Sequence, residues 1–425
     1  MDEIEIIPPS HPLKAVVRPP GSKSITNRIL LLAALAHGES IIDAALFSED
    51  TRHMADSLRR LGFRIEADET AGRISIFGAG GAIPALGADL FIGGSGTAMR
   101  FLSAFVTLGH GAFRLDGNAQ MRARPIGELV RALNALGARA ESENRDEYPP
   151  IIVERGPEDF AGGETRIDAH VSSQFASGLL MPAPLWRNGV ILHIEGDTAQ
   201  PFIQMTVKLM QERGIEVALE DDAVVVRGRQ AYRPGPFTVE PDASAASYFA
   251  AAAALCGGMV EIRGLTANSS QGDLAFFGVL QQMGARVQWS GDGVKVFGSG
   301  HLNGVDIAMN AMPDVAPTLA AIAPFASSPT RIRSVGFIRH HESDRIRALV
   351  TELRRLGAGV QEFDDGLLIE PAPLKPQAVE TYDDHRIAMA FAVTGLKLPN
   401  VRIRNPGCVA KTYPDFFKDL ARLRQ

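Results

Sequence analysis

The chain has 425 residues, of which 45% are hydrophobic and 22% charged, so a disordered protein is excluded and two or three domains are expected. Its net charge of −6 argues against a general nucleic-acid-binding protein and confines any basic site to a local cluster. Two cysteines, Cys256 and Cys408, provide neither a disulfide framework nor metal-ligand spacing.

The beginning of the sequence and its apolar runs indicate where the protein works. Met1-Asp2-Glu3-Ile4-Glu5 is acidic and lacks the basic and apolar regions of a signal peptide. The longest apolar runs, such as 248–256, are too short to cross a bilayer. We therefore expect a cytoplasmic protein with no membrane partner.

The first apolar helix is expected at 24–36, directly after the turn Gly21-Ser22-Lys23. The start of a helix leaves backbone N–H groups unpaired and carries a partial positive charge, so a Gly/Ser turn with a lysine suits an anion. A serine cap is also an ordinary structural feature. At this point capping and anion binding are both open interpretations.

The same arrangement, an apolar helix followed by a strand, recurs along the whole chain. The six helix starts lie roughly 70 to 77 residues apart, a period typical of repeated supersecondary units. The expected helices and strands are 24–36 with 40–43, 96–108 with 112–115, 173–185 with 190–195, 244–256 with 259–263, 314–325 with 330–332, and 384–396 with 401–404.

A second, amphipathic helix is expected in each unit, ending at a glycine in the left-handed C-cap conformation. These glycines are Gly62, Gly137, Gly214, Gly284 and Gly357. The sixth copy is 414–425, after which no strands follow. The two leading strands, 4–7 and 14–18, are expected to complete this sixth unit.

Six units closed in this way predict two three-unit domains, 1–20 with 241–425 and 21–240. The chain crosses between them near 18–21 and again near 239–242, where prolines and a glycine cluster. We expect the crossings to act as a hinge and the active site to occupy the cleft between the domains. A repeat scaffold without catalysis is the alternative.

The starts of the six apolar helices are polar, glycine-rich or charged, which favours an anion site over a plain scaffold. Arginine forks suit phosphate and carboxylate, although a single arginine is more often a solvated surface charge than a ligand. The expected ligand is small and carries several negative groups. The candidate cations are Lys23, Arg28, Arg100, Arg122, Arg124, Arg345, Arg386 and Lys411.

A few acids stand among these cations, chiefly Asp314, Glu342, Asp383 and Asp384. Carboxylates that face anionic ligands can accept or deliver protons, while helix capping remains the alternative for the three aspartates. The grouping of 340–342 with 384–385 lacks an i, i+4 pair of ligands, so no metal is expected.

These motifs resemble the 5-enolpyruvylshikimate-3-phosphate synthase family over the whole chain, in order. The motifs that carry the resemblance are Pro20-Gly21-Ser22-Lys23-Ser24, Gly96-Thr97-Ala98-Met99-Arg100, Arg124-Pro125-Ile126, Ser172-Ser173-Gln174-Phe175, Asp242-Ala243-Ser244, Gln271-Gly272-Asp273, Pro313-Asp314, Glu342-Ser343-Asp344-Arg345, Asp383-Asp384-His385-Arg386 and Cys408-Val409-Ala410-Lys411-Thr412.

The resemblance implies an α/β (α+β) fold with two domains of three βαβαββ units each, the inverted α/β barrel of the enolpyruvyl transferases. It implies transfer of the enolpyruvyl group of phosphoenolpyruvate to the 5-hydroxyl of shikimate 3-phosphate, with release of phosphate. These two small molecules are the expected partners, with no cofactor, no metal and no nucleic acid, and the protein is expected to be a monomer.

By the same resemblance, Asp314 is the base for the 5-hydroxyl, Glu342 protonates the methylene carbon, and Lys23 and Lys411 assist. The expected ligands of shikimate 3-phosphate are Lys23, Ser24, Arg28, Ser172, Ser173, Gln174, Asp314 and His341. The expected ligands of phosphoenolpyruvate are Lys23, Gly96, Arg124, Gln174, Arg345, Arg386 and Lys411.

The sequence departs from the family pattern at four positions. His341 stands where many members have lysine, Ala199 where many have serine, Phe202 where many have tyrosine, and Phe101 where proline is frequent. Two rival functions are an enolpyruvyl transferase acting on UDP-N-acetylglucosamine and an inactive homologue that only binds. The first class has a cysteine in the loop before Arg-Pro, where residues 118–123 have none.

Overall fold

The computed structural model describes residues 2–154, 160–170, 172–196, 200–220 and 222–424. The chain divides into two compact units. Unit 1 is Met1–Pro20 with Glu240–Gln425, and unit 2 is Gly21–Val239. The boundaries expected from the sequence differ from these by a single residue, Glu240.

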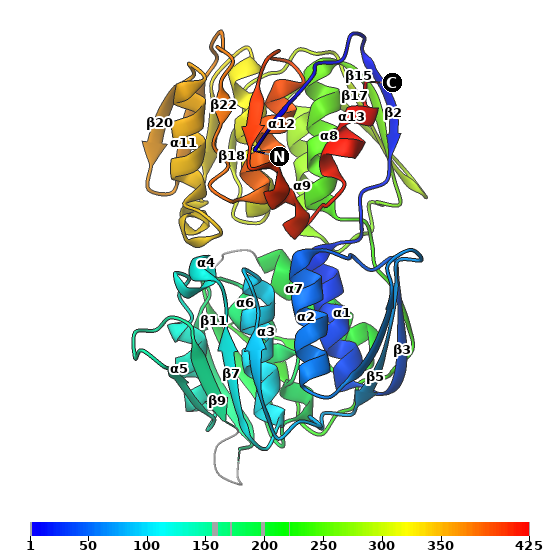
Figure 1. The fold of residues 1–425 in the computed structure, drawn as a ribbon, viewed down its shortest axis with the longest axis vertical. Helices are drawn as coiled ribbons and strands as arrows, with labels where there is room; N and C mark the ends of the chain where they lie inside the picture. The colour runs from blue at the N-terminus through cyan, green and yellow to red at the C-terminus, as the bar shows by residue number, and fades with distance from the viewer. Residues whose placement is uncertain (1, 155–159, 171, 197–199, 221, 425) are drawn as a thin grey trace. The chain divides into compact units, whose positions relative to one another are not determined.

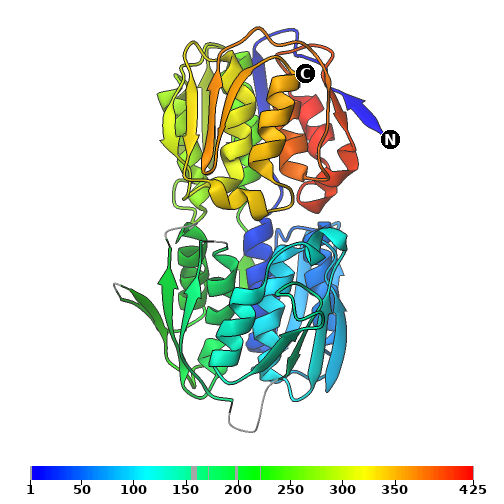
Figure 2. The ribbon, with the colours of Figure 1, turned by 90° about the vertical axis from the view of Figure 1, so that its left-hand side faces the viewer.

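Unit 2 contains three repeats of the helix–strand pattern (Figures 1 and 2). Its helices are α1 (Lys23–Leu35), α2 (Glu49–Arg60), α3 (Gly96–Phe105), α4 (Ala119–Arg122), α5 (Gly127–Ala135), α6 (Gln174–Leu180) and α7 (Gln200–Glu212). Its strands are β3 (His37–Asp43), β4 (Arg64–Asp68), β5 (Arg73–Ala79), β6 (Gly87–Phe91), β7 (Ala112–Asp116), β8 (Arg139–Ser142), β9 (Ile151–Glu154), β10 (Gly162–Asp168), β11 (Gly189–Glu195), β12 (Val217–Leu219), β13 (Ala223–Val226) and β14 (Pro236–Thr238).

Unit 1 repeats the same plan. Its helices are α8 (Ala243–Cys256), α9 (Ala275–Gln282), α10 (Ala316–Ile322), α11 (Arg345–Arg355), α12 (His385–Gly395) and α13 (Phe416–Arg422). Its strands are β1 (Glu3–Glu5), β2 (Leu13–Val17), β15 (Gly258–Arg263), β16 (Arg286–Ser290), β17 (Gly293–Gly298), β18 (Asp306–Ala308), β19 (Thr330–Arg333), β20 (Gly359–Phe363), β21 (Gly366–Glu370), β22 (Ala378–Val379) and β23 (Arg402–Arg404).

The first helix of each repeat is buried, as its apolar sequence predicts. In unit 1, α8, α10 and α12 pack against one another, and every residue of α8 before Cys256 is buried. In unit 2, α3 packs against both α1 and α6. The sheets lie outside these helices within each unit (Figures 1 and 2). Each unit therefore has its own hydrophobic core.

Three of these helices end earlier than expected, two of them at prolines. The helix expected at 173–185 is α6 followed by the 3-10 helix η2 (Ala183–Leu185), after Pro182. The helix expected at 314–325 is η4 (Pro313–Val315), α10 and η5 (Ala323–Phe325). Proline lacks the N–H that continues an α-helix. The helix expected at 96–108 also tightens, into η1 (Val106–Leu108) before Gly109.

The second helices end as predicted. All five glycines have positive φ, at +94° for Gly62, +95° for Gly137, +89° for Gly214, +105° for Gly284 and +97° for Gly357. The left-handed conformation of these residues lets the chain turn from the helix into the next strand.

The described residues form six sheets, and five of them have four strands. In these five, a leading strand runs parallel to the strand after the buried helix, and a hairpin completes the sheet in antiparallel pairing. The sixth has the order β1-β23-β22. Among the described residues, no helix combines the length and apolar character needed to cross a membrane.

The placement of one leading strand was predicted wrongly. β1 does join the sheet of the last repeat, but β2 runs parallel to β15 in the sheet of the first repeat of unit 1. Likewise β14 leads the first sheet of unit 2, parallel to β3. Each unit thus takes a leading strand from the segment just before the chain leaves it, so position in the sequence alone did not identify the partner.

Candidate active site

The turn before α1 is held by a cap and by a buried ion pair. The Ser22 hydroxyl accepts the backbone N–H of Ile25, 3.5 Å away. Lys23 Nζ lies 3.3 Å from Oδ2 of Asp50, whose side chain is 3% exposed. Asp50 was missed in the sequence because an acid in the first turn of a helix such as α2 is already explained by the helix dipole.

Arg28 is fully buried in unit 2 and donates its hydrogen bonds to uncharged oxygens. The acceptors are Thr206 Oγ1 at 2.7 Å, the Ser24 carbonyl at 2.9 Å, Ser177 Oγ at 3.2 Å and the Phe202 carbonyl at 3.2 Å. Because no carboxylate accompanies it, burial lowers the pKa of Arg28 to about 9. These bonds leave one of its five N–H groups without a partner among the described residues.

Two of the departures from the family pattern are in contact with Arg28. The ring of Phe101 lies under its guanidinium, 5.0 Å from the ring centroid, and is completely buried. Phe202 contributes its backbone carbonyl, which any residue at this position would supply. Ala199 lies outside the described residues.

Gly96 begins α3 at the point where two guanidinium groups converge. A Cβ at this position would lie 2.6 Å from Nη1 of Arg124 and 2.8 Å from Nη1 of Arg100. Arg100 also donates to the carbonyls of Gly96 and Pro125. The structure thus brings Gly96 and Arg124 together. Arg122 instead pairs with Asp116 and is half-exposed.

Ser172, Ser173 and Gln174 form the start of α6. Ser172 Oγ accepts the backbone N–H of Gln174 at 3.2 Å, and Ser173 is buried. The side-chain oxygen of Gln174 is buried with no hydrogen-bond partner among the described residues. One turn later Ser177 contacts Arg28, which links this helix to α1. Ser177 and Thr206 were not identified from the sequence.

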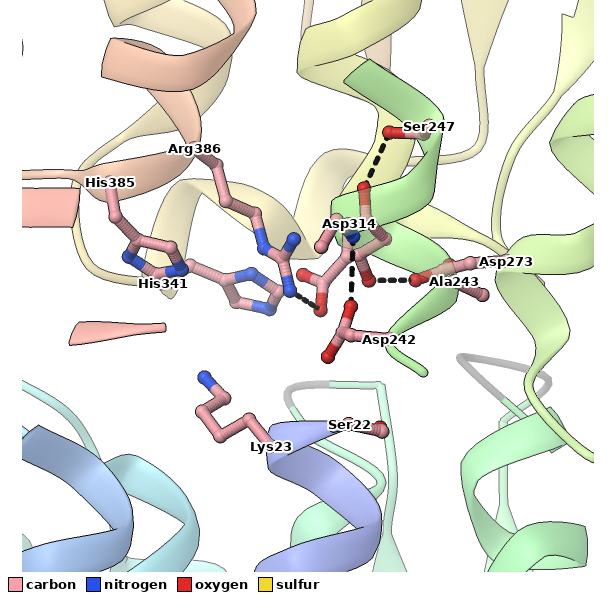
Figure 3. A network of polar contacts seen from close by, with 12 residues as sticks. Ser22, Lys23, Asp242, Ala243, Ser247, Asp273, Asp314, His341, His385 and Arg386 are labelled. Carbon is pink, nitrogen blue, oxygen red and sulfur yellow. Dashed lines mark hydrogen bonds and ion pairs between the residues drawn. The ribbon is translucent and has the colours of Figure 1, made fainter. Parts of the chain in front are cut away.

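In unit 1, Asp314 lies between two arginines. Its Oδ2 accepts from Nη2 of Arg386 at 2.6 Å (Figure 3). Its Oδ1 accepts from Nη1 of Arg345 at 3.1 Å. Asp314 comes from η4, and the arginines come from the starts of α11 and α12. Both arginines are buried, so this aspartate belongs to a charge network rather than serving as a simple cap.

The same network contains Glu342, His341 and Lys411. Glu342 Oε2 accepts from Arg345 Nη2 at 2.7 Å, and its Oε1 lies 3.5 Å from Lys411 Nζ. Arg345 Nη1 is 3.0 Å from His341 Nδ1. Arginine only donates, so this ring nitrogen is the acceptor in the contact. All the unit 1 residues expected at the site are therefore joined through Arg345.

Of the other acids, Asp384 and Asp344 cap helices, whereas Asp383 does not. Asp384 is completely buried, accepts the backbone N–H of Arg386, and also binds Nε of Arg345 at 2.8 Å, so it is both a cap and an ion-pair partner. Asp344 caps α11 and pairs with Arg339. Asp383 is exposed and accepts from Asn405.

Burial and charge act in opposite directions on the two arginines. Burial disfavours the charged form, but Asp384, Glu342 and Asp314 raise the pKa of Arg345 above its ordinary value. Against the same burial, Asp314 is the strongest of the groups that raise the pKa of Arg386. Both groups stay cationic and can bind an anion that displaces a carboxylate. Among the described residues, no group of three or more potential metal ligands occurs.

Comparison with known proteins agrees with this chemistry. Residues 7–420 match the family model described as EPSP synthase (3-phosphoshikimate 1-carboxyvinyltransferase). The 3-phosphoshikimate 1-carboxyvinyltransferase of Nostoc punctiforme is 50% identical over 419 residues, covering 98% of each chain. One from Escherichia coli is 44% identical over 413 residues, covering 96% of this chain and 95% of the relative.

Solved structures agree in fold. EPSP synthase from Acinetobacter baumannii superimposes with a TM-score of 0.82 at 25% identity, covering 100% of this chain and 98% of the other. The enolpyruvyl transferase NikO from Streptomyces tendae, at 19% identity, covers 99% of this chain and 97% of its own, with a TM-score of 0.75. The two-domain enolpyruvyl transferase fold is thereby confirmed, and the chain belongs to the EPSP synthase (3-phosphoshikimate 1-carboxyvinyltransferase) family.

Proposed function

We propose that this protein transfers the enolpyruvyl group of phosphoenolpyruvate to the 5-hydroxyl of shikimate 3-phosphate and releases phosphate, a step of the shikimate pathway. Membership of the family supports this activity. The observation that carries its mechanism is that Asp314 and Glu342 share one network with Arg345, Arg386 and Lys411. Two carboxylates and three cations suit a proton-transfer reaction between anionic substrates.

In the proposed addition step, the 5-hydroxyl oxygen bonds to C2 of phosphoenolpyruvate while Asp314 takes the hydroxyl proton and Glu342 gives a proton to C3. In the elimination step, Glu342 takes a proton back from C3, the C2–C3 double bond re-forms, and the C2–O bond to phosphate breaks. The proton on Asp314 passes to the released phosphate, so both carboxyl groups return to their starting states and atoms and electrons balance without a cofactor. Lys23 and Lys411 stabilise negative charge on the phosphate as it leaves.

The anionic substrate itself prepares these acids. Arg345, Arg386 and Lys411 are proposed ligands of phosphoenolpyruvate, and each of them contacts Asp314 or Glu342. A phosphate or carboxylate group that binds these cations weakens their ion pairs with Asp314 and Glu342. Proton uptake by Asp314 in the addition step and by Glu342 in the elimination step then becomes easier.

In unit 2 the proposed ligands of shikimate 3-phosphate are Ser24 and Arg28 for the carboxylate and Ser172 and Ser173 for the phosphate. Gln174 and Lys23 contact both substrates, Gly96 and Arg124 complete the phosphoenolpyruvate site, and Asp314 and His341 of unit 1 complete the shikimate 3-phosphate site. Since the proposed ligands come from both units, we expect binding to draw the units together. Small-angle X-ray scattering tests this, and an unchanged radius of gyration with shikimate 3-phosphate would contradict it.

Phosphate release from phosphoenolpyruvate tests the activity, with shikimate 3-phosphate or UDP-N-acetylglucosamine as acceptor and with or without EDTA. We expect release only with shikimate 3-phosphate and no effect of EDTA. Release only with the nucleotide sugar would replace the proposed acceptor, and release with neither would identify an inactive binding homologue. We further propose a monomer that acts in the cytoplasm, which sedimentation equilibrium and cell fractionation would test.

A further inference from the structure

A second buried carboxyl group lies beside Asp314. Asp273 belongs to η3 (Gly272–Leu274) and is 4% exposed. Its Oδ2 accepts a hydrogen bond from the Ser244 hydroxyl, whereas its Oδ1 has no hydrogen-bond partner among the described residues. A buried carboxylate oxygen without a donor is costly, so this group needs an explanation beyond packing.

The surroundings fix Asp273 in place. The side-chain amide of Gln271, two residues earlier, accepts the backbone N–H of Ala243 at 3.0 Å and donates to the Pro241 carbonyl at 2.8 Å. These bonds tie η3 to the start of α8. On its other side η3 packs against η4, which carries Asp314. Figure 3 shows Asp242, Asp273 and Asp314 gathered at this helix start.

The charged and titratable groups around Asp273 come from three elements. They are Asp242, which caps α8, Asp314 of η4, and Arg386 of α12. α9 also packs against η3 and has no titratable side chain. Burial first, and then the charge of Asp314, raises the pKa of Asp273 to about 7, opposed by Arg386 and the Ser244 hydrogen bond.

We propose that Asp273 is a positioning residue whose protonation state sets how much of the Arg386 charge is available to phosphoenolpyruvate. The inference rests on the proposed function, in which Arg386 binds this substrate. When Asp273 is neutral, it does not compete for the guanidinium of Arg386, which can then interact with Asp314 and with the substrate. Ionised Asp273 adds a second buried negative charge, which competes for Arg386 and repels an incoming anion.

The test compares KM for phosphoenolpyruvate in the wild type and Asp273→Asn from about pH 6 to about pH 8.5. In the wild type, KM should rise above about pH 7, by up to about tenfold per pH unit. In Asp273→Asn, which stays neutral, only the titration of the substrate itself should remain. The KM for shikimate 3-phosphate should follow the same pH dependence in both proteins. Equal phosphoenolpyruvate profiles would overturn the inference.

Asp292→Asn is the matched control, because Asp292 is an exposed aspartate in the turn between β16 and β17 of the same unit. Its profile should equal that of the wild type. Ser244→Ala provides a second test, which can be used even if Asp273→Asn folds poorly. Loss of the hydroxyl donor should move the rise in KM to higher pH, and an unmoved rise would count against the inference.

The failure of the proposed function would be visible separately. If the wild type released no phosphate with shikimate 3-phosphate, that function would fall, and the pH series would be repeated as phosphoenolpyruvate affinity by calorimetry. A steeper loss of affinity with pH in the wild type than in Asp273→Asn would still support the role of Asp273. Parallel curves would still overturn it.

Discussion

The two units hold their buried arginines in opposite ways. In unit 2, Arg28 is surrounded by two hydroxyls and two backbone carbonyls, none of which carries charge. In unit 1, Arg345 contacts three carboxylates, those of Asp314, Glu342 and Asp384. Both side chains are almost fully buried, so burial does not explain the difference.

The kind of acceptor around each arginine determines which chemistry its cluster suits. Neutral acceptors satisfy the N–H groups of a guanidinium without cancelling its charge, so Arg28 keeps a positive field for an anionic ligand. Carboxylates cancel the charge of Arg345, but they also place proton acceptors beside the cations. Unit 2 is therefore suited to binding and unit 1 to proton transfer, with Lys23 and Asp50 as the exception in unit 2.

The largest effect is expected from removing the proton-transfer groups of unit 1. Asp314→Ala and Glu342→Ala should each lower kcat by about a hundredfold to ten-thousandfold, with a much smaller change in KM. Steady-state phosphate release measures both constants. Asp292→Ala, which removes an exposed aspartate from the same unit, is the control and should leave both unchanged. A large rise in KM with normal kcat would make these residues ligands and erase the contrast between the units.

A pH effect on stability should come next, because unit 1 has more buried acid than its cations neutralise. The pKa of Asp273 rises from 3.8 to about 7 on folding. The stability contributed by the protonated carboxyl is complete below about pH 4 and is lost as the pH rises through about 7. Asp273→Asn should therefore gain stability over the wild type across this window, on the order of a few kcal/mol.

Thermal unfolding at several pH values would measure this gain. The midpoints of the two proteins should converge near pH 4 and separate toward pH 8, while Asp292→Asn should follow the wild type throughout. A constant difference between the midpoints of Asp273→Asn and the wild type would mean that Asp273 titrates normally, and that the carboxylates of unit 1 are fully balanced by its cations.

Much of this contrast could be predicted from the sequence, because it depends on local patterns. Apolar helices with polar starts identified the buried helices, and the glycines after the second helices were identified from their positions. What the sequence did not reveal was the pairing of distant segments. β2 joins a sheet formed about 240 residues later, and Arg28 binds Thr206, 178 residues away. Neither partner carries a local signal.

Asp50 and Asp273 were missed for a different reason. An acid in the first turn of α2 has an ordinary explanation, and Asp273 was recognised only as part of a family motif. Their importance lies in burial beside a specific charge, which composition does not reveal. The prolines that end α6 and divide the helix around α10 are visible in the sequence, but the apolar pattern continues across them and predicts a longer helix.

The binding role of unit 2 can be tested at Arg28. Arg28→Lys keeps the charge but loses the fork that reaches Thr206, Ser177 and the Phe202 carbonyl. We expect KM for shikimate 3-phosphate to rise about tenfold to a hundredfold, with a smaller fall in kcat. Arg122→Lys, at a half-exposed arginine of the same unit, is the matched control. A fall in kcat alone would place Arg28 with the proton-transfer groups.

The smallest effect is expected at the Lys23–Asp50 pair, where unit 2 holds a cation by a buried carboxylate. Asp50→Asn would give Lys23 a neutral acceptor in place of the buried carboxylate 3.3 Å away. Lys23 would then have a neutral hydrogen-bond acceptor, as Arg28 already has. If Asp50 aims Lys23 at the reacting atoms, kcat should fall about threefold to tenfold, because an amide holds the ammonium less firmly.

Loss of the Asp50 charge in Asp50→Asn should not weaken substrate binding, although it lowers kcat. Removing a buried negative group should leave KM for both anionic substrates unchanged or lower, so a fall in kcat without a rise in KM distinguishes aiming from general damage. Asp56→Asn, an exposed aspartate on the same helix, should change neither constant. A higher KM in Asp50→Asn would instead mean that this carboxylate helps to form the binding site. The contrast between a binding unit and a proton-transfer unit would then hold only for their buried arginines.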